Sequence, residues 1–124
     1  MKEYAIIVAG GSGSRMQSNL PKQFLPLANR PVLMHTIEAF RRYSKDLYII
    51  VVLPDTTMQL WEKLCQQHNF RHSFKLVAGG NSRTESVKNG LDSIKDSDSL
   101  VAIHDGVRPL VQPEIISASF RLAE

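Results

Sequence analysis

The chain has 124 residues, 43% hydrophobic and 22% charged, a length and composition that suit one soluble domain with a buried core. Its net charge of +3 is mild and its cations form neither a stripe nor a tail, so we expect no nucleic-acid partner. No apolar run is long enough to cross a bilayer, and Cys65 is the only cysteine, so we expect a cytoplasmic protein without membrane contact, disulfides or a zinc site.

The first half of the chain alternates between predicted strands and helices. An apolar run at residues 4–8 predicts a buried strand, which a glycine-rich loop follows. Pro31 marks the start of a helix whose apolar residues repeat at helical spacing up to Phe40. A continuous apolar run at 47–53 predicts a strand buried on both faces, and residues 56–69 predict a second helix with its tryptophan in the core.

The second half repeats this alternation. Residues 74–78 predict a third strand, and residues 81–94 predict a helix in which Val87, Leu91 and Ile94 recur at helical spacing. Residues 100–103 predict a fourth strand, and a final helix is expected from Pro113. This order predicts an α/β fold for residues 1–124, with a doubly wound, mostly parallel sheet and helices on both faces.

The loop after the first strand has the composition of a phosphate-binding loop. Gly10, Gly11 and Gly13 leave backbone N–H groups accessible to an anion, and the cations Arg15 and Lys22 follow. The loop of nucleoside triphosphatases is excluded because the required Gly-Lys pair is absent.

The dinucleotide fingerprint GxGxxG is a weak match, since Met16 stands where the third glycine should be. Three polar segments, residues 10–22, 79–86 and 105–108, follow predicted parallel strands. Ligands bind outside the carboxyl ends of such strands, so we expect these segments to form one site.

The four segments GGSGSRM, PKQF, GGNSRTESV and HDGVRP, in this order, resemble the cytidylyltransferases that act on 2-C-methyl-D-erythritol 4-phosphate. The resemblance covers the whole chain and implies a Rossmann-like nucleotidyltransferase fold. It also implies that the chain is the N-terminal part of that fold, with the C-terminal part missing, and that the full-length protein is a homodimer. The implied reactants are CTP and a polyol phosphate, with Mg²⁺ as cofactor.

The resemblance also implies roles for individual residues. Arg15 and Lys22 match the catalytic cations that stabilise charge on the α-phosphate. Asp105 and Arg108 match the substrate-binding residues, and Asp105 is also the expected contact to the metal, directly or through water. The residues that match the nucleotide pocket are Ala9, Gly10, Gly11, Ser12, Gly13, Gly80, Asn81 and Ser86.

Two departures from the family pattern bear on nucleotide binding. The first loop reads AGG where many members have AAG, and Asn81 stands where some members have an acidic residue. We expect His104 to have a core or supporting role. Two other functions stay open: a ribitol 5-phosphate cytidylyltransferase, whose motifs are nearly the same, and a CTP-binding module without turnover.

Overall fold

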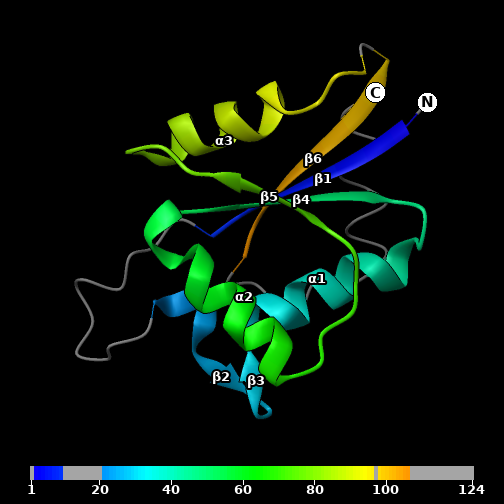
Figure 1. Ribbon diagram of the computed structural model, residues 1–124. Coiled ribbons are helices and arrows are strands. Elements are labelled where there is room, and N and C mark those ends of the chain that lie inside the picture. The colour runs from blue at the N-terminus through cyan, green and yellow to red at the C-terminus, as the bar shows by residue number, and fades with distance from the viewer. Residues whose placement is uncertain (1, 10–20, 97, 107–124) are drawn as a thin grey trace.

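A parallel sheet with helices on both faces forms the centre of the computed structural model, which describes residues 2–9, 21–96 and 98–106 (Figure 1). The strands of this sheet are β1 (Lys2–Val8), β4 (Tyr48–Leu53), β5 (Lys75–Ala78) and β6 (Ser99–Asp105). The helices are α1 (Val32–Tyr43), α2 (Met58–Gln67) and α3 (Arg83–Asp92), with 3₁₀ turns η1 (Lys22–Phe24) and η2 (Asp55–Thr57). A small hairpin, β2 (Pro26–Leu27) and β3 (Arg30–Pro31), precedes α1.

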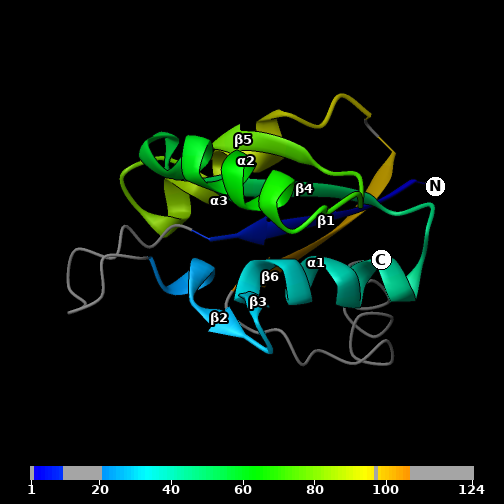
Figure 2. The same cartoon turned by 60° about the horizontal axis from the view of Figure 1, so that its bottom comes forward.

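The sheet has the order β5-β4-β1-β6, and every neighbouring pair in it is parallel. From β1 the chain moves outward through α1 to β4 and through α2 to β5, then returns through α3 to β6 on the other side of β1. Helices α1 and α2 cover one face of the sheet and α3 covers the opposite face (Figures 1 and 2). The predicted doubly wound fold is therefore confirmed, and its switch point lies between β1 and β6.

The sheet is buried on both faces, which explains the continuous apolar runs in β1 and β4. Ile7 and Val51 face the larger core beneath α1 and α2, whereas Ile6 and Val52 face the smaller core beneath α3. All four side chains are at most 1% exposed. A strand buried on one face would instead alternate apolar and polar residues.

Helix α3 approaches the sheet closely at Gly90. A Cβ atom there would lie 3.0 Å from the Cγ2 atom of Ile6 and 3.2 Å from that of Val52. The side of the helix that carries Gly90 faces the sheet, and Leu91 is 42% exposed although it shares the helical spacing of Val87 and Ile94. The helix was correctly predicted from the spacing, but the side of α3 that packs on the sheet is the one on which Gly90 allows a close approach.

The last described strand extends further than the sequence predicted. Strand β6 extends to Asp105, because β1 pairs with it in register as far as Val8 opposite Asp105. His104 therefore belongs to the strand, where its ring packs edge-on against that of Phe40, with the ring centroids 5.3 Å apart. The helix predicted from Pro113 lies outside the described residues.

The hairpin before α1 has no counterpart in the sequence prediction. Its two turn residues, Ala28 and Asn29, have φ values of 53° and 68°, the pattern of a type I′ turn. The usual signal for such a turn is Asn-Gly or Asp-Gly, and the strands are two residues long. The sequence therefore lacks the signals from which this hairpin could have been predicted.

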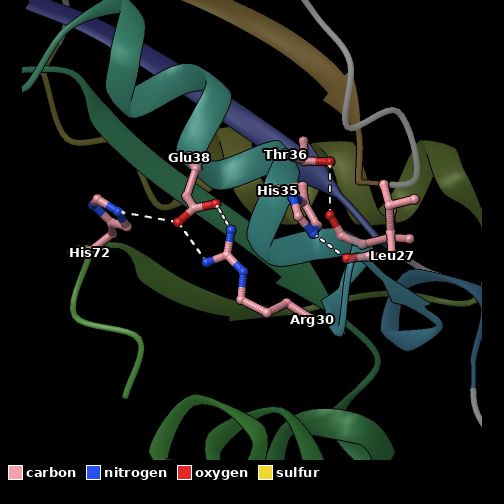
Figure 3. A network of polar contacts seen from close by, with 7 residues as sticks. Leu27, Arg30, His35, Thr36, Glu38 and His72 are labelled. Atoms are coloured by element: carbon pink, nitrogen blue, oxygen red, sulfur yellow. Dashed lines mark hydrogen bonds and ion pairs between the residues drawn. The ribbon is translucent and has the colours of Figure 1, made fainter. Parts of the chain in front are cut away.

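Polar contacts fasten this hairpin to α1, as Figure 3 shows. Arg30 of β3 forms a two-pronged ion pair with Glu38 of α1, in which Nη1 lies 2.7 Å from Oε2. His72 approaches the same carboxylate, with Nε2 3.8 Å from Oε2. The ring of His35 contacts the carbonyl oxygen of Leu27. The hydrogen bonds from Arg30 hold the pKa of Glu38 below its usual value.

Candidate active site

A cavity of about 400 Å³ opens at the carboxyl ends of the strands, beside the switch point between β1 and β6. Its lining comes from the end of β1, from η1, from the turn between β5 and α3, and from the end of β6. The lining residues are Val8, Ala9, Lys22, Gln23, Gly80, Asn81, Ser82, Arg83, Ser86 and Asp105. Segments far apart in the sequence therefore meet where a parallel sheet is expected to bind its ligand.

The turn between β5 and α3 is held by a network of side-chain to backbone bonds. Ser82 caps α3 by accepting a bond from the N–H of Glu85 at 3.1 Å, and Glu85 accepts one from the N–H of Asn81 at 2.8 Å. The hydroxyl of Ser86 accepts a bond from the N–H of Gly80 at 3.1 Å. A Cβ atom at Gly80 would lie 2.4 Å from that of Glu85, so only glycine fits there.

The ends of β1 and β6 are joined through backbone contacts. The N–H of Gly106 donates to the carbonyl of Val8 at 2.9 Å, and the hydroxyl of Thr36 donates to the carbonyl of Gly106 at 3.0 Å. A Cβ atom at Gly106 would lie 2.9 Å from the Cβ atom of Ala9. The absence of a side chain at Gly106 therefore lets the two strand ends approach at the cavity edge.

Lys22 lies on the 3₁₀ turn η1, which begins after Pro21. Lys22 is exposed and lines the cavity, whereas Gln23 and Phe24 are 1% and 2% exposed. The ring of Phe24 stacks on Trp61 of α2, with centroids 5.8 Å apart and planes 7° apart. The lysine backbone is thus anchored to the core, and its side chain is free to meet a ligand.

The charges on the cavity wall have both signs. Arg83, in the first turn of α3, places its Nε atom 3.4 Å from the Oδ1 atom of Asp105. Together with Lys22 it gives two cations and one carboxylate on the wall. The N-terminus of α3 adds the positive end of a helix dipole. This combination suits a polyphosphate bound with a divalent cation.

The predicted site residues divide into two groups. Those that line the cavity together are Ala9, Lys22, Gly80, Asn81, Ser86 and Asp105. Those that lie outside the described residues are Gly10, Gly11, Ser12, Gly13, Arg15 and Arg108. Sequence reasoning missed Gln23, Ser82 and Arg83 as cavity residues. All three residues belong to PKQF or GGNSRTESV, the segments that form walls of the site, and this membership could have indicated that they line the cavity.

Cys65 is not among the residues that line the cavity. Cys65 is half-buried on α2, and burial together with nearby Glu62 raises the pKa of its thiol to about 11. A thiol that stays protonated near neutral pH is a poor nucleophile, in agreement with a structural role.

Among the described residues, no group of three or more His, Cys, Asp and Glu side chains could hold a metal ion. Nor is any described helix long and apolar enough to cross a membrane.

Comparison with known proteins gives the family. The model of the 2-C-methyl-D-erythritol 4-phosphate cytidylyltransferase (IspD) family matches residues 4–124. The chain belongs to this family. Curated cytidylyltransferases of that name from Azobacteroides pseudotrichonymphae and Bacteroides thetaiotaomicron are each 52% identical to it, over 99% and 100% of the chain. The chain spans 55% and 56% of their respective lengths.

Solved structures give the same result for the fold. The 4-diphosphocytidyl-2C-methyl-D-erythritol synthase of Anaerococcus prevotii superposes with a TM-score of 0.78 at 27% identity, covering 99% of this chain and 51% of that one. The bifunctional IspDF of Campylobacter jejuni superposes with a TM-score of 0.72 at 24% identity, covering 94% of this chain and 29% of that one. The predicted nucleotidyltransferase fold of a cytidylyltransferase family member is confirmed.

Proposed function

We propose that the protein carrying this chain transfers a cytidylyl group from CTP to 2-C-methyl-D-erythritol 4-phosphate. The products are 4-diphosphocytidyl-2-C-methyl-D-erythritol and diphosphate, a step of non-mevalonate isoprenoid biosynthesis. The observation that carries the proposal is the cavity itself. In a chain of this family it joins small residues around Ala9 and Gly80 to the cation Lys22 and the carboxylate Asp105.

The backbone-rich wall of the cavity suits the base and ribose of CTP. Ala9, Gly80, Asn81 and Ser86 have small or short side chains, and the close packing of Gly80 on Glu85 leaves little room to widen the pocket. We propose that the base bound against this wall is a pyrimidine. We therefore expect CTP to be preferred over ATP and GTP.

The chemistry of the transfer requires preorganised charge. As the acceptor phosphate attacks the α-phosphate and diphosphate leaves, negative charge spreads over the transferring group, and cations aimed at it lower the barrier. Lys22 on its anchored turn is suited to this role, with Arg15 as the second cation. Arg108 would contact the acceptor.

Mg²⁺ is the proposed cofactor, and Asp105 is the residue that would hold it, directly or through water. Mg²⁺ prefers oxygen ligands and is commonly bound by one or two carboxylates together with the phosphates of the substrate. Asp105, the one carboxylate among the described residues of the cavity wall, fits that pattern. When bound, the ion would neutralise the phosphates of CTP. A homodimer in the cytoplasm remains part of the proposal.

Diphosphate release tests the proposed function. Full-length protein is mixed with CTP and Mg²⁺, and with either 2-C-methyl-D-erythritol 4-phosphate or ribitol 5-phosphate as acceptor. We expect turnover with the first acceptor and at least tenfold lower kcat/KM with the second. A preference for ribitol 5-phosphate would assign the other cytidylyltransferase activity. Binding of CTP without release from either acceptor would leave a nucleotide-binding module and overturn the proposal.

A further inference from the structure

Gln23 is a buried polar side chain next to the proposed catalytic lysine. It is 1% exposed, and burying an amide is costly unless the amide is hydrogen-bonded. Its Nε2 atom donates to the carbonyl oxygen of Ala9 at 3.0 Å. Ala9 directly follows β1, so this bond joins the first cavity segment to η1 across 14 positions of sequence.

The three residues of η1 have different surroundings. Lys22 faces the cavity, Gln23 bonds to the backbone at Ala9, and Phe24 stacks on Trp61 in the core. The N–H of Leu25 donates to the carbonyl of Lys22 at 3.2 Å and closes the turn. In so short a turn, a shift at Gln23 moves the backbone of Lys22 as well.

The hydrogen bond distinguishes Gln23 from a residue that only fills space. A methionine of similar length would occupy the same volume without the cost of burying an amide. The amide adds hydrogen bonding, including the bond to Ala9, one of the residues expected to contact the nucleotide. The bond therefore ties two walls of the cavity together.

We propose that Gln23 is a positioning residue that holds Lys22 at a set distance from the backbone of Ala9. The inference rests on the proposed cytidylyl transfer. Gln23 itself is not a catalytic residue, since it acts through the turn that carries Lys22. Misplacing a catalytic group by about 1 Å can cost on the order of 100-fold in rate.

A double-mutant cycle in the full-length protein tests the coupling. Gln23→Met keeps the length of the side chain and removes the donor, and Gln66→Met on the exposed face of α2 is the matched control. We expect Gln23→Met to lower kcat roughly 10- to 100-fold, with a smaller change in KM for CTP. In the Gln23→Met background, Lys22→Ala should lower kcat by a factor several-fold smaller than it does in the wild-type protein. In the Gln66→Met background, Lys22→Ala should lower kcat by the same factor as in the wild-type protein. Additive effects in the Gln23→Met background, or an unchanged kcat, would overturn the inference.

Amide hydrogen exchange separates this inference from the proposed function. The N–H groups of Phe24 and Leu25 are bonded to the carbonyls of Pro21 and Lys22, so they report on opening of η1. We expect their exchange to be roughly tenfold faster in Gln23→Met than in Gln66→Met, whether or not the protein turns over CTP. Equal exchange overturns the positioning role. An inactive wild-type protein overturns only the cytidylyl transfer. If Gln23→Met does not fold, Gln23→Glu has a similar shape without the donated N–H and must give the same faster exchange.

Discussion

Phe24 and Trp61 stack with their ring planes 7° apart, and this contact connects the turn that carries Lys22 to the main core. Trp61 is fully buried and also meets Phe70 and Phe74. Removing it would leave a large cavity beneath η1. A substitution of Trp61 should therefore lower the stability of the protein and also disturb the turn that carries Lys22.

We expect Trp61→Ala to destabilise the protein by about 3–5 kcal/mol, because a large aromatic side chain is lost from a packed core. Trp61→Phe should cost clearly less, since it keeps a ring against Phe24. Urea unfolding followed by circular dichroism measures both. A urea unfolding curve unchanged by Trp61→Ala would mean that α2 is wrongly placed on the sheet.

Thr36 ties α1 to the end of β6. Its side chain is fully buried and its hydroxyl donates to the carbonyl of Gly106. Thr36→Val keeps the shape but leaves this carbonyl without its donor, so we expect a loss of about 1–3 kcal/mol. Thr56→Val, at an exposed position of η2, should change stability little. Equal effects of the two variants in urea unfolding would argue against the importance of the bond.

The parts of the fold that sequence could predict are those with strong, local physical signals. The apolar runs of β1 and β4 are buried on both faces, as a parallel sheet between helices requires. The described parts of the predicted polar segments, Lys22, residues 80–86 and Asp105, meet because parallel strands place their carboxyl ends at one edge. The first inference needed only the apolar runs themselves, and the second needed only the order of the elements.

The parts that sequence missed depend on contacts between distant residues. The side of α3 that faces the sheet depends on how closely Gly90 approaches Ile6 and Val52, so the exposure of Leu91 could not be read from spacing alone. The pairing of Arg83 with Asp105 likewise depends on where the first turn of α3 lies relative to the end of β6. Such details need coordinates.

Ser86 is predicted to support the nucleotide pocket in two ways. It is 3% exposed and accepts the hydrogen bond of the Gly80 N–H, and it also lines the cavity. Ser86→Ala should lower stability by about 1 kcal/mol and weaken CTP binding roughly tenfold. Calorimetry with CTP and thermal melting measure the two effects. Ser73→Ala, at an exposed position, is the control, and equal CTP affinity in both variants would remove Ser86 from the pocket.

The ion pair of Arg30 with Glu38 predicts a pH dependence of stability (Figure 3). The pKa of Glu38 is lower in the folded protein than in the unfolded chain, so its stabilising contribution is complete above the unfolded value. The contribution is lost as the pH falls through the folded value. Glu38→Gln should therefore cost about 1 kcal/mol at pH 7 and much less at pH 3. Glu62→Gln, at an exposed position on α2, is the control and should change the free energy of unfolding equally at the two pH values. A loss of unfolding free energy in Glu38→Gln that is equal at pH 7 and pH 3 would contradict the prediction.

Lys22 provides the most direct test of the catalytic assignment. Its side chain is exposed on the cavity wall while its neighbours Gln23 and Phe24 anchor the turn, so Lys22→Ala should leave the melting temperature nearly unchanged. Loss of one preorganised cation should lower kcat roughly 10²- to 10³-fold, with little change in KM for CTP. Lys63→Ala, an exposed position on α2, is the control and should keep full activity. If Lys22→Ala raises KM at constant kcat, the lysine binds CTP equally well in the ground state and the transition state and gives no stabilisation specific to the transition state. If neither parameter changes, Lys22 has no part in the reaction.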